Sequence, residues 1–73
     1  MPRYHEVGDL VRIPQCRVIN EHAVKHIQKP TPALLLGKAR DLMTDKVWGD
    51  DDYAVLIDGE TWVVDQLYIQ EWR

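Results

Sequence analysis

Residues 53–72, YAVLIDGETWVVDQLYIQEW, decide the fold of this chain. Two runs rich in β-branched residues flank the pair Asp58-Gly59. Between apolar runs, Asp-Gly is the strongest short-range signal of a β-hairpin, because a type I′ turn needs positive φ at both central residues. The stretch predicts strands at residues 53–57 and 60–64, one turn of 3₁₀ helix at residues 65–67 and a last strand at residues 68–72.

The first half of the chain predicts two more strands. Residues 10–13 follow a Gly-Asp turn and form the first strand, which Pro14 ends or interrupts because proline cannot donate a hydrogen bond to the sheet. Residues 33–43, ALLLGKARDLM, predict the second strand, in which Gly37 marks a bend or bulge. A helix is the alternative for this segment, since Ala, Leu, Lys, Arg and Met all favour one.

Residues 20–29, NEHAVKHIQK, are compatible with two structures. One is a short helix that has Asn20 as its N-cap and ends before Pro30. The other is an irregular loop. In either case the sequence predicts a long connection between the first and second strands.

Composition limits the class of protein. A chain of 73 residues forms one domain with one small core. The net charge of −3 argues against a dedicated nucleic-acid binder, which normally presents a basic surface. A single cysteine, Cys16, permits no disulfide within the chain and is typical of a protein made in a reducing cytoplasm. No apolar run approaches the length of a membrane span, so we expect no membrane partner.

The order of these elements resembles the SH3-like barrels. It is more closely similar to the small barrel proteins of tailed, especially marine, bacteriophages. The residues that carry the resemblance are Gly8, Asp9, Leu10, Val11, Gly37, Val55, Asp58, Gly59, Trp62, Val63 and Leu67. The resemblance implies a mainly β fold, a small five-stranded SH3-like barrel over residues 1–73, with a long loop at residues 20–32 that is irregular or partly helical. It also implies a binding scaffold and supplies no catalytic residue.

Aromatic and acidic residues of the second half supply a candidate interface. Trp48 lies in a loop beside an acidic run, so we expect it to be exposed, followed by Tyr53 and Trp72. Exposed Trp and Tyr side chains are frequent binding hot spots. Asp50 and Asp51 could face a basic patch on a partner. The aromatic residues that we expect to pack in the core instead are Trp62 and Tyr68.

Metal ligands are sparse. His22 and His26 are four residues apart and would share one face of a helix, with His5 and Cys16 available to complete a site. Two histidines in a loop are more often simply solvated, so we expect no metal and no cofactor. The consecutive residues 50–52 do not provide the alternating carboxylates of a calcium loop.

The sequence contains no nucleophile motif and no phosphate-binding glycine loop, so we expect no enzymatic activity. The first hypothesis is a protein–protein interaction module, a small virion or accessory protein of a tailed phage. Its partners would be other virion proteins or a second copy, in the host cytoplasm or in an assembled particle. One alternative is a nucleic-acid-binding or translation-associated barrel, prompted by basic residues in the first half. The other is a small inhibitor of a host enzyme.

Overall fold

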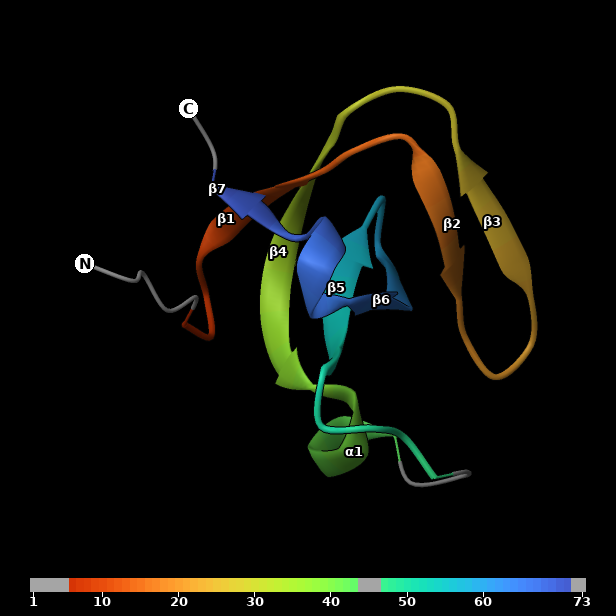
Figure 1. Ribbon diagram of the computed structural model, residues 1–73, viewed down its shortest axis with the longest axis vertical. Coiled ribbons are helices and arrows are strands. Elements are labelled where there is room, and N and C mark those ends of the chain that lie inside the picture. Colours follow the sequence, from red (N-terminus) through yellow and green to blue (C-terminus); the bar gives the residue numbers. More distant parts are fainter. Residues whose placement is uncertain (1–5, 44–46, 72–73) are drawn as a thin grey trace.

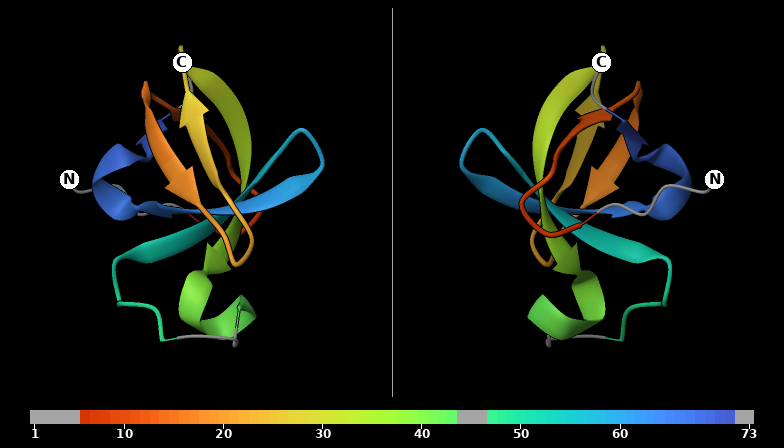
Figure 2. Two further views of the ribbon diagram at one scale, coloured as in Figure 1. Left: turned by 90° about the vertical axis from the view of Figure 1, so that its right-hand side faces the viewer. Right: turned by 90° about the vertical axis from the view of Figure 1, so that its left-hand side faces the viewer.

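The computed structural model describes residues 6–43 and 47–71, and the chain in this part is mainly β (Figure 1). Its strands form one antiparallel sheet in the order β3-β2-β6-β5-β4-β1-β7. The elements are β1 (Leu10–Ile13), β2 (Cys16–Ile19), β3 (Val24–Ile27), β4 (Thr31–Lys38), α1 (Ala39–Leu42), β5 (Asp52–Ile57), β6 (Glu60–Asp65), the 3₁₀ helix η1 (Gln66–Tyr68) and β7 (Gln70–Glu71). The strands β5 and β6 run across β2, β3 and β4 (Figure 2), so the sheet folds over its own core.

The hairpin predicted at Asp58-Gly59 is confirmed. Asp58 has φ 51° and Gly59 has φ 80°, and the flanking pair Ile57↔Glu60 leaves a two-residue turn. The predicted 3₁₀ turn is also present as η1, where a carboxylate oxygen of Asp65 accepts a hydrogen bond from the backbone N–H of Leu67 at 2.9 Å. The last strand begins at Gln70 rather than at Tyr68 and pairs with β1.

The second predicted strand is correct only in its first part. The register of β4 against β5 shifts between Leu35 and Gly37, and Gly37 has φ 141°, so the predicted bulge is confirmed. Pairing ends at Lys38↔Tyr53, and the chain then forms the single-turn helix α1. The prediction of strand for residues 39–43 was therefore wrong, because helix-favouring residues are no longer held by a neighbouring strand there.

Residues 20–29 form neither a helix nor an irregular loop. They contain the turn and second strand of the β2–β3 hairpin, with pairs from Cys16↔Ile27 to Ile19↔Val24. A side-chain oxygen of Asn20 accepts hydrogen bonds from the backbone N–H groups of His22 and Ala23, both at 2.8 Å. Asn20 thus caps a turn with the same chemistry that would begin a helix.

The expected closure into a five-stranded barrel is not seen. Seven strands are present, and within residues 6–43 and 47–71 no pairing joins the edge strands β3 and β7. The sheet is therefore open. The additional strands, β2 and β3, lie between the first and second predicted strands, where they pair with each other.

The core consists of two adjoining clusters. The larger contains Val11, Ile13, Val18, Ile27, Ala33, Leu35, Val55, Ile57, Trp62, Val64 and Ile69, and the smaller contains Ala39, Met43, Trp48, Ala54 and Val63. Trp62 is 4% exposed, which confirms its predicted core position. Tyr68 is 46% exposed, so its predicted burial was wrong, and Ile69 provides the buried side chain after η1.

Candidate functional site

A cleft opens where β2 separates from β6. The two strands pair only at Ile19↔Val63, and the side chain of Asn20 donates a hydrogen bond to the carbonyl of Thr61 at 3.2 Å beside that pair. Continued in the same register, the pairing would place Arg17 opposite Asp65. The strands diverge instead, and residues of both line a cavity of about 600 Å³, which we call the β2–β6 cleft. This volume lies within the range of ligand-binding sites.

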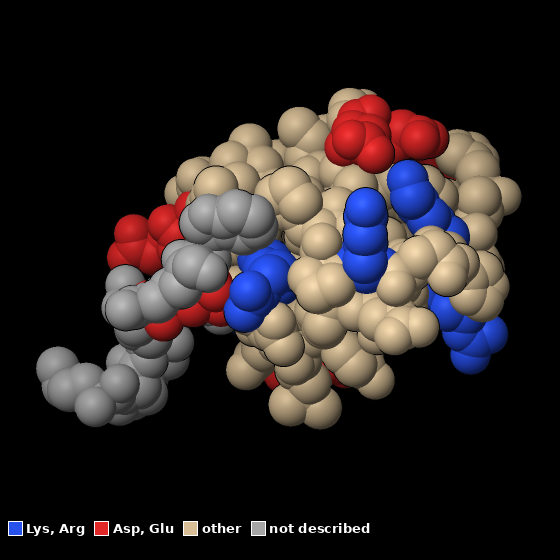
Figure 3. All heavy atoms as spheres, turned by 90° about the horizontal axis from the view of Figure 1, so that it is seen from above, with Lys and Arg blue, Asp and Glu red and all other residues tan. Residues whose placement is uncertain are grey.

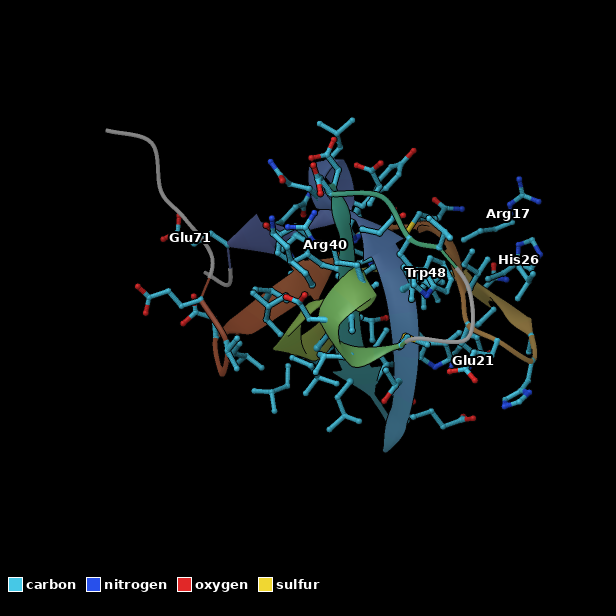
Figure 4. All side chains as sticks on the ribbon, turned by 90° about the horizontal axis from the view of Figure 1, so that it is seen from below. Arg17, Glu21, His26, Arg40, Trp48 and Glu71 are labelled. Atoms are coloured by element: carbon cyan, nitrogen blue, oxygen red, sulfur yellow. The ribbon has the colours of Figure 1, made fainter. Side chains whose placement is uncertain are left out.

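The cleft is lined by apolar, aromatic and charged side chains. Its lining consists of Gln15, Cys16, Arg17, Ile19, Val24, Trp48, Asp52, Val63, Val64, Asp65 and Tyr68. Trp48 and Val63 are buried together in the smaller core cluster and form the floor, whereas Val64 is buried on the other face of β6. Val24 and Tyr68 are 56% and 46% exposed. Figure 4 shows Trp48 on the segment that precedes β5, close to the β2–β3 hairpin. In the same view Arg17 extends from the hairpin.

Two carboxylates face each other across neighbouring strands on one side of the cleft. Asp52 and Asp65 are direct partners in the β5–β6 register, and like charges in that position destabilise a sheet. The carboxylate of Asp52 accepts from the backbone N–H of Gly49 at 2.9 Å, as that of Asp65 does from Leu67. Each ionised carboxylate has further acceptor sites beyond one such bond. The two carboxylates can therefore still bind a cationic group.

The opposite side of the cleft carries one positive charge. Arg17 is exposed, and it makes no hydrogen bond or ion pair with any residue of 6–43 and 47–71. Its guanidinium has five N–H donors, which remain available to carbonyl or carboxylate oxygens of a bound partner. Cys16 lies beside it, and burial raises the pKa of the Cys16 thiol above its ordinary value of 9.0.

The structure corrects the expected exposure of Trp48, which is only 8% exposed. Its ring packs in the smaller core cluster with residues of α1, β5 and β6. The physical reason is that the loop before β5 folds back over one end of the sheet, where a large side chain is needed to cover α1 and β6. Trp48 is therefore a floor residue of the cleft and not an exposed hot spot.

The other predicted interface residues do not gather in the cleft. Tyr53 is half-buried against the larger core cluster. Asp50 is exposed and forms an ion pair with Arg40, and the carbonyl of Asp51 accepts from the backbone N–H of Gln66 at 2.8 Å. Trp72 lies outside the described residues.

Sequence reasoning did not assign five residues of the cleft to an interface: Arg17, Val24, Asp52, Asp65 and Tyr68. The two aspartates carried a usable signal. Counting outward from the Asp58-Gly59 turn, each residue of β5 meets a residue of β6, and this count places Asp52 opposite Asp65. The position of Arg17 had no such signal, because it depends on the β2–β3 hairpin.

The structure does not support a metal site at His22 and His26. His22 lies in the turn of the hairpin and His26 in β3, so no helix places both on one face. Among the described residues, no three potential ligands of the His, Cys, Asp and Glu type cluster together. His5 lies outside the described residues.

A second surface feature is an apolar stripe across the outer face of the sheet. Leu10 pairs with Leu34, and Leu34 pairs with Leu56 in turn. Leu10 is 51% exposed and Leu34 is 37% exposed. The stripe lies outside the cleft and so provides control positions for mutagenesis.

Comparison with family models, with curated proteins and with solved structures found no match to this chain. In the described part of the chain, no helix is long and apolar enough to cross a membrane.

Proposed function

We propose that this chain is a non-enzymatic protein–protein interaction module that binds a segment of another protein in the β2–β6 cleft. The observation that carries the proposal is the composition of the cleft. An apolar floor at Trp48 and Val63 is bordered by the exposed ring of Tyr68. Arg17, which forms no ion pair with the described residues, lines the same cleft. Tyr, Trp and Arg are the residue types enriched in protein interfaces and in their hot spots.

We infer that the scaffold is a variant of the SH3-like barrel. The order β7-β1-β4-β5-β6 and the 3₁₀ turn before the last strand support this inference. The β2–β3 hairpin then occupies the place of the long loop between the first and second barrel strands. On the resemblance to small phage barrel proteins, we place the chain among virion or accessory proteins made in the host cytoplasm.

A nucleic-acid partner has less support. Figure 3 shows Lys and Arg side chains on one end of the molecule, separated by uncharged surface and with acidic residues near them. Lys25 lies 4.0 Å from the carboxylate of Asp58, so part of this positive charge is already neutralised within the chain. A phosphate backbone is normally bound by a continuous basic surface. Capture of a host enzyme stays an alternative that uses the same cleft.

A matched pair of variants tests the proposal. Val24 in the cleft and Leu10 on the apolar stripe are 56% and 51% exposed, so a lysine at either position should be tolerated by the fold. In a tagged pull-down from nuclease-treated lysate, the wild type and Leu10→Lys should retain the same protein, whereas Val24→Lys should lose it. Thermal melting of all three chains controls for unfolding.

Equal retention by Val24→Lys and the wild type would contradict a binding site in the cleft. Loss of all retained proteins upon nuclease treatment would instead favour the nucleic-acid alternative. A single retained host enzyme, lost from Val24→Lys, would support the cleft and identify the chain as an inhibitor or regulator.

A further inference from the structure

We propose that the segment bound in the β2–β6 cleft is an extended, basic peptide that adds a strand to the free edge of β6. This inference rests on the proposed function and specifies the chemistry of the partner. It goes beyond the cleft itself by assigning the backbone conformation of the partner and the sign of its charge.

The first argument is the free edge. Along its length β6 pairs with β5 at six positions, from Asp52↔Asp65 to Ile57↔Glu60. On its other side it pairs with β2 at Ile19↔Val63 alone. Beyond Val63, the edge of β6 that faces the cleft has no strand partner among the described residues. An unpaired strand edge is a template for another extended segment, which it binds through main-chain hydrogen bonds.

The second argument is the shape of the site. Side chains of an extended segment alternate between opposite faces. The cleft offers an apolar floor around Trp48 and partly exposed side chains at Val24 and Tyr68. Side chains of the bound segment on the face of β6 that carries Asp65 can therefore reach the two carboxylates, whereas the intervening side chains lie on the opposite face, which carries the apolar Val64.

The third argument is charge. The lining contains two carboxylates, Asp52 and Asp65, and one guanidinium, Arg17, so it has an excess of one negative charge. The two carboxylates are direct cross-strand partners whose repulsion a bound ammonium or guanidinium group would relieve. Arg17 is then left to donate to carbonyl oxygens of the same segment. A segment with Lys or Arg between apolar residues fits this arrangement.

The test uses three fluorescein-labelled, end-capped hexapeptides and fluorescence anisotropy. The first alternates Lys and Val, the second alternates Glu and Val, and the third is the Lys-Val peptide with alternate backbone amides methylated. We expect the Lys-Val peptide to bind, and methylation to weaken binding about tenfold by removing main-chain hydrogen bonds. The Glu-Val peptide should bind more weakly still.

Charge-removing variants identify the site of binding. Asp52→Asn and Asp65→Asn each retain a side-chain oxygen that can accept the existing backbone hydrogen bond. Combined in one chain, they should weaken binding of the Lys-Val peptide about tenfold, whereas Leu10→Lys should leave it unchanged.

Three outcomes would overturn the inference: equal binding of the methylated peptide, preference for the Glu-Val peptide, or binding of none of the three. Each of them is distinct from failure of the proposed function. If Val24→Lys abolishes protein capture while the peptides fail, the cleft binds a protein in another way. If Val24→Lys has no effect on capture, the cleft is not the site at all.

Discussion

At the scale of single residues, the pairing of Asp52 with Asp65 is the least expected feature of this molecule. Direct cross-strand like charges reduce stability, and each carboxylate here also lies at the side of a cleft. Their hydrogen bonds to Gly49 and Leu67 explain why an acceptor is useful at both positions, but those bonds do not require a charge. We interpret the two negative charges as groups that bind a cationic group of a ligand.

This interpretation predicts that Asp52→Asn or Asp65→Asn stabilises the free protein. The amide keeps an acceptor while the repulsion is removed, so the free energy of unfolding should rise by about 0.2–1 kcal/mol. Urea denaturation at low ionic strength measures the gain. Added salt should reduce it, because salt screens charges at partly exposed positions. A loss of stability in both variants would show that the charges support the fold.

At the scale of secondary-structure elements, the β2–β3 hairpin creates the cleft. Among the described residues, its backbone pairs with the rest of the sheet only at Ile19↔Val63, and the side chain of Asn20 donates a hydrogen bond to the carbonyl of Thr61. Val18 and Ile27 also pack in the larger core cluster. Lys25 adds a further contact, since its ammonium lies 5.9 Å from the centre of the Trp62 ring. The position of the hairpin therefore depends on the burial of Val18 and Ile27 in the larger core cluster and on the specific interactions of Asn20 and Lys25.

Asn20→Ala should loosen this hairpin. The substitution removes two acceptor bonds within the turn and one donor bond to β6, and we expect a loss of about 1–3 kcal/mol in the free energy of unfolding. Denaturant unfolding measures the loss, and amide hydrogen exchange should show faster exchange in β3. Gln28→Ala, at an exposed position after β3, is the control. Wild-type stability and exchange in Asn20→Ala would contradict this account of the turn.

At the scale of the whole molecule, local signals predicted local structure well. The Asp58-Gly59 turn, the bulge at Gly37 and the 3₁₀ turn all follow from backbone preferences within a few residues, and all are present. Trp48 could not be placed in this way, because its burial depends on how the loop before β5 returns over α1.

The candidate site was less predictable than the strands. Asn20 was recognised as a cap, but a cap of a turn and a cap of a helix use the same hydrogen bonds, so the hairpin was missed. Because the hairpin was not predicted, the sequence could not place Arg17 on the side of the cleft opposite Asp65. A cleft formed by two strands that diverge after one pair is a tertiary feature, and no periodicity in the sequence reports it.

The most direct test of the central claim uses Cys16, the only cysteine of the chain, which lines the cleft. Burial raises the pKa of its thiol, so its reaction with an aromatic disulfide reagent is best followed at mildly alkaline pH. We would measure the modification rate of the free chain and of its complex with the protein that Val24→Lys fails to retain. Our account predicts that the bound partner slows the reaction severalfold; an unchanged rate in the saturated complex would contradict binding in the β2–β6 cleft.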